Sequence, residues 1–85
     1  MKYLYFTSVN CMPCRQLGPI LDRVKSQGIP VQKIDVDTPN PLITEMGIRN
    51  VPTVILVSKT NEEYARMVGV QPESMYISTY KEFNQ

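Results

Sequence analysis

Cys11 and Cys14 are the residues of this chain that most directly suggest chemistry, and they are its only cysteines. They follow a short apolar run and directly precede a helical apolar pattern. A Cys-x-x-Cys pair at a strand-to-helix junction is typical of thiol–disulfide exchange sites. This spacing places both side chains on one face of a helix, with β-carbons about 5–6 Å apart. The pair can close into a disulfide with local adjustment, which suits a bond that must open again.

Cys11 is the candidate nucleophile because it is expected at the helix N-terminus. Unpaired backbone N–H groups point toward the sulfur there and favour the thiolate. The chain has no histidine, so the helix N-terminus is the main activator that we can name. Cys14, one turn further on, is the candidate resolving thiol. Pro13 has no N–H, so it withholds one donor from the sulfurs and stiffens the turn.

Length and composition predict one domain covering residues 1–85. Eighty-five residues are too few for two hydrophobic cores, and an apolar fraction of 42% is enough to fill one. Nine basic and eight acidic residues nearly cancel, and no basic stretch exceeds two residues. We therefore expect neither a nucleic-acid partner nor a membrane-surface partner.

No apolar run approaches the ~18 residues that span a bilayer. The N-terminus also lacks the apolar core and cleavage site of a signal peptide. We therefore expect a cytoplasmic, monomeric protein, in which a lone cysteine pair is more often redox-active or metal-binding than structural. Zinc needs about four ligands, and two cysteines without histidine supply half a site. We expect no metal and no cofactor beyond the redox-active disulfide. A metal site shared between subunits, or a glutathione-assisted 2Fe–2S cluster, is the alternative.

The hydrophobic pattern predicts an α/β fold in the order βαβαββα. Short apolar or β-branched runs predict strands at residues 3–7, 31–36, 53–57 and 62–68, the last two antiparallel. Helical periodicity and capping signals predict helices over residues 11–27, over residues 40–47, and from Pro72 onward. The last helix carries Tyr76, Tyr80 and Phe83 on one side, where we expect them in the core.

Three stretches resemble thioredoxin. They are the Cys-x-Pro-Cys motif followed by Arg15 and Pro19, the segment 46–54, and the segment 67–70. Thioredoxin's first strand and helix have no counterpart, so the chain resembles the compact, glutaredoxin-sized version of the fold and small phage-encoded thioredoxins in style. The resemblance implies a minimal thioredoxin fold, with a central mixed four-stranded sheet flanked by helices.

The resemblance also implies further site residues. It places Pro52 next to the sulfurs after a cis peptide bond, which leaves the Val51 backbone free to pair with a substrate strand. Gly69 would let the substrate chain pass close. Met12, Val51 and Val70 would form the apolar rim of a shallow docking groove. Without the resemblance, an ordinary trans proline opening a strand is the preferred interpretation of Pro52.

The chain departs from the thioredoxin pattern at a position close to the chemistry. The buried aspartate six residues before the first cysteine is here Tyr5, and Lys33 matches the lysine that would face it. Losing that carboxylate predicts a simpler pH profile, governed chiefly by Cys11. A second, carboxylate-like step would point to Asp35 or Asp37, which can equally be plain strand-edge and turn residues.

Three functions are compatible with these features. The first is a protein-disulfide reductase that acts on disulfide-containing proteins and is recycled by a thioredoxin-reductase-type flavoenzyme. The second is a glutaredoxin-like reductant, fed by glutathione or dedicated to ribonucleotide reductase. The third is a non-enzymatic binding subunit built on the same scaffold. Uncharged residues at the glutathione-binding positions, Ser8 and Gln71-Pro72, favour the first.

Overall fold

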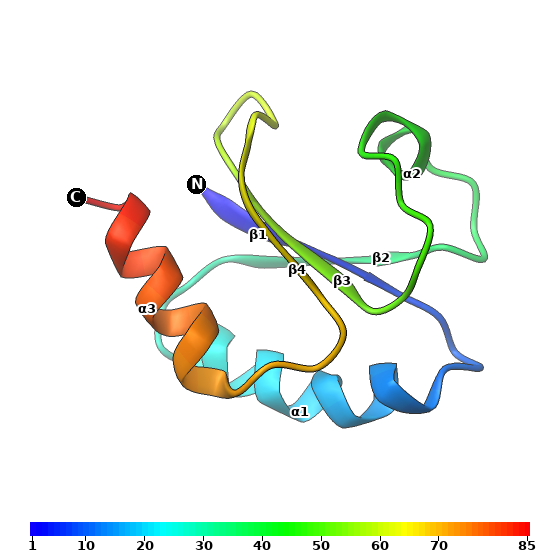
Figure 1. Ribbon diagram of the computed structural model, residues 1–85, viewed down its shortest axis with the longest axis horizontal. Coiled ribbons are helices and arrows are strands. Elements are labelled where there is room, and N and C mark those ends of the chain that lie inside the picture. The colour runs from blue at the N-terminus through cyan, green and yellow to red at the C-terminus, as the bar shows by residue number, and fades with distance from the viewer.

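The computed structural model describes residues 1–85 and shows a mixed four-stranded sheet with helices on both faces (Figure 1). The strands are β1 (Lys2–Thr7), β2 (Val31–Asp35), β3 (Thr53–Val57) and β4 (Glu63–Val68). They lie in the order β2-β1-β3-β4, with β1 parallel to β2 and the other neighbours antiparallel. The helices are α1 (Met12–Ser26), α2 (Pro41–Glu45) and α3 (Glu73–Phe83). The predicted α/β class and element order are confirmed.

Local sequence signals explain where the helices begin. Cys11 has extended backbone angles and is the N-cap of α1. The Asn40 side chain accepts a hydrogen bond from the Leu42 N–H at 2.9 Å, which caps α2, and Pro41 occupies the first helical position. None of the three helices combines the length and apolar composition needed to cross a membrane.

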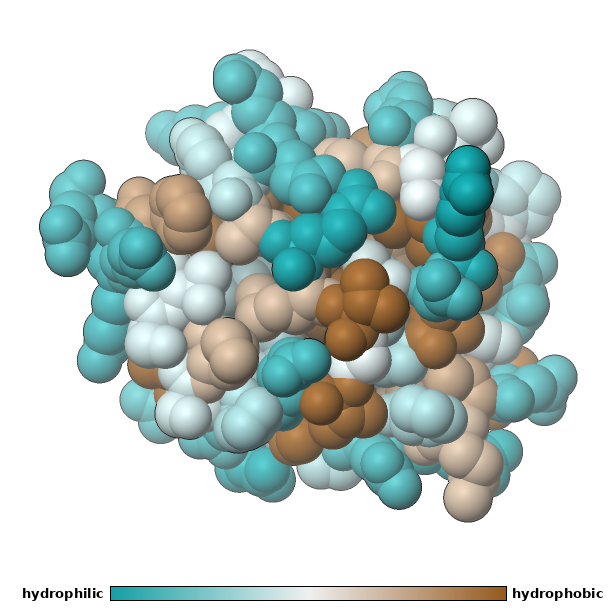
Figure 2. Space-filling model, viewed as in Figure 1, coloured by the Kyte–Doolittle hydropathy of each residue, from teal (hydrophilic) through white to brown (hydrophobic).

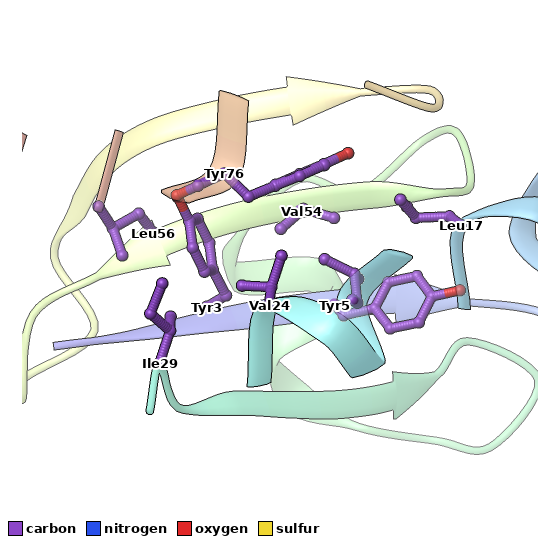
Figure 3. Packing of buried hydrophobic residues seen from close by; sticks show 9 residues of the cluster. Tyr3, Tyr5, Leu17, Val24, Ile29, Val54, Leu56 and Tyr76 are labelled. Carbon is purple, nitrogen blue, oxygen red and sulfur yellow. The ribbon is translucent and has the colours of Figure 1, made fainter. Parts of the chain in front are cut away.

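One face of the sheet packs against α1 and α3. Tyr3 and Tyr5 point to this face from alternate positions of β1, as the pleat of a strand requires. They join Leu17, Leu21 and Val24, which recur at i, i+4 and i+7 along α1. All five are at most 4% exposed, and Figure 3 shows the α1 side chains lying between the helix and the strands. This packing fixes α1, and with it the two cysteines, against the sheet.

The opposite face is covered by α2 and the segment that follows it. Phe6 from β1 and Ile55 from β3 are fully buried there. Leu42, Ile43 and neighbouring apolar residues pack on them from α2 and beyond. The sheet is therefore buried on both sides, which explains the almost continuous apolar character of β3.

A tyrosine pair joins α3 to the sheet. The Tyr3 hydroxyl donates a hydrogen bond to the Tyr76 carbonyl oxygen at 2.6 Å, and the two rings meet edge to face. The Gln71 N–H donates to the Tyr76 hydroxyl at 3.2 Å. Burial raises the pKa of Tyr3 and of Tyr76 above the ordinary phenol value. Both side chains therefore serve as neutral structural groups.

The expectation that Phe83 belongs to the core is wrong. Burial falls along α3, from Tyr76, which is fully buried, through Tyr80, which is half-buried, to Phe83, which is 43% exposed. Phe83 lies in the last turn of the helix and stacks on Tyr64 of the edge strand β4, with ring centroids 5.5 Å apart. Periodicity placed it correctly on the inward side of the helix, but the helix end reaches the edge of the sheet rather than its centre.

Candidate active site

The two cysteines lie where the chain passes from β1 into α1 (Figure 1). The loop between β1 and α1 is held on one side by a hydrogen bond, because the Ser8 hydroxyl donates to Asp37 Oδ2 at 2.7 Å. On the other side, Arg15 Nη2 donates to the Val9 carbonyl oxygen at 3.4 Å. These contacts hold the entrance to α1 against the turn that follows β2.

Cys11 and Cys14 form a disulfide, with their Cα atoms 5.2 Å apart. Cys11 is half-exposed at the N-cap, whereas Cys14 is only 3% exposed and faces the core. The Cys14 N–H donates to Cys11 Sγ at 3.2 Å. This is the kind of contact that stabilises a thiolate at a helix N-terminus after the disulfide opens.

The difference in exposure gives the two sulfurs different access to a substrate. An incoming disulfide can approach Cys11 from solvent, whereas Cys14 can reach only a sulfur already held at Cys11. The first turn of α1 contains no acidic residue that would oppose a thiolate. Pro13 lies in this turn, where its missing N–H costs no helical hydrogen bond.

The segment before β3 lies against the cysteine pair. The Val51–Pro52 peptide bond is cis, and Cys11 Sγ lies 3.7 Å from the Val51 carbonyl oxygen. The Thr53 hydroxyl donates to the Asn50 carbonyl oxygen at 2.6 Å. The Gly69 N–H donates to the Pro52 carbonyl oxygen at 2.9 Å. The Val51 N–H has no hydrogen-bond partner within the chain, so it is available to another strand.

Val9 and Met12 lie close to Cys11 in the sequence, and Val68 and Val70 flank Gly69, whose N–H donates to the Pro52 carbonyl oxygen. We call these four exposed apolar side chains the apolar rim. Their exposed fractions are 66%, 68%, 51% and 36%. Figure 2 shows that exposed hydrophobic side chains lie near the middle of the molecule in this view, next to strongly hydrophilic ones. Gly69, between the two β4-end valines, has φ of +82°, and a Cβ there would meet open space.

Sequence reasoning proposed Met12, Val51 and Val70 for the rim and did not name Val9 and Val68. The Val51 side chain is half-buried. Val9 lies two residues before Cys11 in a loop, where an apolar side chain has no core to enter. Val68 follows the half-buried Met67 in β4, so strand alternation turns it outward. Both signals were readable in the sequence.

Behind the cysteines, the Tyr5 hydroxyl donates to the Cys14 carbonyl oxygen at 3.0 Å, and the Tyr5 side chain is 4% exposed. In Figure 3 this hydroxyl points toward α1. Tyr5 and Cys14 both line a hollow of about 260 Å³, which Lys33 and Asp35 also line from β2. Asp37 does not line it. The parallel register of β1 and β2, which pairs Tyr5 with Lys33, creates this grouping.

Comparisons by sequence and by structure both show that this chain is similar to thioredoxins. The family model described as thioredoxin matches residues 3–82. A thioredoxin of Pyropia yezoensis is 32% identical over 76 residues, which cover 86% of this chain and 70% of that protein. A thioredoxin-like protein of Synechocystis is 36% identical over 81 residues, covering 92% of this chain and 76% of that protein. A mutant thioredoxin from Halobacterium salinarum superposes with a TM-score of 0.88 at 30% identity, covering 98% of this chain and 74% of that one.

Proposed function

Because the chain belongs to the thioredoxin family, and is thus a thiol–disulfide oxidoreductase, we propose that it reduces protein disulfides by dithiol exchange at Cys11 and Cys14. The observation that carries this proposal is the unequal placement of two bonded sulfurs. One is half-exposed at a helix N-cap, where it accepts the Cys14 N–H, and the other is buried one turn further on. The redox-active disulfide is then the only redox group that the reaction requires.

In the proposed cycle, the Cys11 thiolate attacks one sulfur of a substrate disulfide. A bond forms between Cys11 Sγ and that sulfur, the substrate S–S bond breaks, and the other substrate sulfur leaves as a thiolate. Cys14 then attacks Cys11 Sγ, which forms the Cys11–Cys14 disulfide and releases the second substrate thiolate. The substrate gains two electrons and the protein loses two.

The substrate is held by strand pairing and apolar contact. The unpaired Val51 N–H can pair with an extended substrate segment, and main-chain pairing supplies affinity that does not depend on sequence. The apolar rim then packs against the side chains that flank the substrate disulfide. This arrangement suits disulfide-containing proteins in general, and ribonucleotide reductase would be one such substrate.

The charges near the site bear on which molecule donates electrons to the disulfide. Glutathione carries two carboxylates and an amine, and it needs charged partners to hold them. Ser8 is uncharged and already bonded to Asp37, and Gln71 is uncharged and donates to the Val68 carbonyl oxygen. Arg49 is exposed, and a single exposed ion pair contributes little affinity. We therefore propose a thioredoxin-reductase-type flavoenzyme as the donor.

We expect turnover of a disulfide protein such as insulin to be faster with NADPH and thioredoxin reductase than with NADPH, glutathione and glutathione reductase. The measurement is the rate of NADPH consumption in the two systems at equal protein concentration. A variant in which both cysteines are replaced by serine is the control and should be inactive in both systems.

If glutathione supports turnover at least as fast as the reductase does, the glutaredoxin-like alternative replaces this proposal. If neither system supports turnover, the binding-subunit alternative replaces it.

A further inference from the structure

Because Cys14 is buried, some group near it must accept its thiol proton during the reaction. Cys14 must lose its thiol proton when it attacks Cys11 Sγ, yet its side chain is only 3% exposed. The position from which thioredoxins supply a buried carboxylate holds Tyr5, so this chain has no carboxylate there. The Tyr5 hydroxyl proton is moreover directed at the Cys14 carbonyl oxygen, not at the sulfur.

The hollow behind the motif is lined by both buried and exposed residues, with Cys14 among the buried ones. Its floor contains the buried residues Tyr5, Thr7 and Cys14, while the exposed Val9 and Arg15 lie among its outer lining. A water molecule occupies about 30 Å³ in the liquid, so a hollow of about 260 Å³ has room for several. Water held by the polar groups of such a hollow can bridge groups that do not touch.

Only one carboxylate lines this hollow, and it is that of Asp35. The other charged groups that face it are Arg15 from α1 and Lys33 from β2. Asp22 and Lys25 line a separate hollow of about 210 Å³ further along α1. The Ser8 hydroxyl, which also lines the first hollow, donates its proton to Asp37. Among these groups, Asp35 alone offers a carboxylate, a kind of group that serves as a general base.

The strand register explains why Asp35 reaches this place. Asp35 pairs with Thr7 and Lys33 with Tyr5 in the parallel ladder between β2 and β1. Asp35 is half-buried, and its Oδ1 accepts the Asp37 N–H at 2.9 Å, which fixes the side chain at the strand end. The second carboxylate oxygen takes part in no hydrogen bond within the chain.

We propose that Asp35 accepts the Cys14 proton, through water in this hollow, during the step that resolves the mixed disulfide. The Cys14 S–H bond breaks, its electron pair forms the new bond to Cys11 Sγ, and the proton passes to the Asp35 carboxylate. The substrate sulfur leaves with the electrons of the mixed disulfide. Asp35 then returns the proton to solvent. This inference rests on the proposed dithiol exchange, and it favours the second, carboxylate-like step at Asp35 over a profile governed chiefly by Cys11.

The test separates the two chemical steps in one experiment. The reduced protein is mixed with an equimolar aromatic disulfide, dithiobis(nitrobenzoate), whose released thiolate is coloured. The first release reports the attack of Cys11, and the second reports the attack of Cys14. Both rates are recorded by stopped flow across the pH range from weakly acidic to alkaline.

We expect Asp35→Asn to slow the second release about tenfold near neutral pH, somewhat less than a directly positioned general base contributes. The first release should be unchanged, and the deficit should close at alkaline pH, where hydroxide removes the proton. Asparagine keeps an oxygen for the Asp37 N–H, so the turn after β2 is preserved. Asp35→Glu, which keeps a carboxylate in the hollow, should recover much of the rate.

Asp22→Asn is the matched control, because it removes the same charge from an exposed residue of the separate hollow further along α1, and it should change neither rate. An unchanged second release in Asp35→Asn would overturn the inference. A faster one would also overturn it, since it would mean that the Asp35 charge merely opposes the Cys14 thiolate. Absence of the first release in the unsubstituted protein would instead refute the dithiol exchange, and the inference with it.

Discussion

Cys11→Ser is expected to lower the rate of disulfide reduction to the uncatalysed background. Cys14→Ser should still attack a substrate disulfide through Cys11 but should not release the reduced substrate. A serine hydroxyl is not ionised at neutral pH and cannot replace the thiolate that attacks the substrate. In Cys14→Ser the half-exposed Cys11 still reacts, but no second thiol follows. We therefore expect a stable mixed disulfide, one substrate per protein, detected by mass spectrometry under non-reducing conditions.

The two serine variants control for each other. Each removes one sulfur and the Cys11–Cys14 disulfide, so any general effect of losing the bond on stability is shared. Only the position of the remaining thiol differs. Accumulation of a substrate adduct on Cys14 in the Cys11→Ser variant would reverse the assigned roles.

Leu17→Ala is expected to cause the largest loss of stability among single changes close to the site. Leu17 lies one turn after Cys14 on α1, is fully buried, and packs with Tyr5 and Val54. Truncating a buried leucine costs about 2–5 kcal/mol, out of a total of about 5–15 kcal/mol for a typical domain. Each kcal/mol lowers the Tm of a domain of this size by about 4–8 °C, so we expect a fall of at least about 8 °C.

The measurement is thermal and urea unfolding of the oxidised protein, followed by circular dichroism. Gln16→Ala is the matched control, because it changes the preceding, exposed residue of the same helix and should stay within about 0.5 kcal/mol of the unsubstituted protein. A cost for Leu17→Ala below about 1 kcal/mol would show that α1 is not anchored through this side chain. The placement of the cysteines would then need another explanation.

The sequence predicted those features of the fold that depend on local patterns. The apolar stripe of α1 marks which side of the helix meets the sheet, and the pair Asn40 and Pro41 marks the start of α2. Residues 53–57 were predicted as a central strand, and β3 has these bounds. Each of these patterns consists of residues close together in the sequence, so predicting the element required no knowledge of tertiary contacts.

What the sequence did not predict depends on contacts between distant residues. The grouping of Tyr5, Cys14 and Asp35 around one hollow requires both the parallel register of β1 with β2 and the packing of α1 over them. Phe83 has the periodicity of a core residue, but its exposure depends on where the helix ends relative to the sheet. The cis peptide before Pro52 came only from resemblance, because an isolated Val-Pro sequence favours trans.

The most direct test of the account is competitive alkylation of the reduced, unsubstituted protein. Limiting iodoacetamide is added near neutral pH, and the modified cysteine is located by mass spectrometry of the proteolytic peptide. The account predicts that Cys11, half-exposed at the helix N-cap, is modified first and that Cys14, 3% exposed, reacts much more slowly. Preferential modification of Cys14, or equal modification of both cysteines, would contradict it.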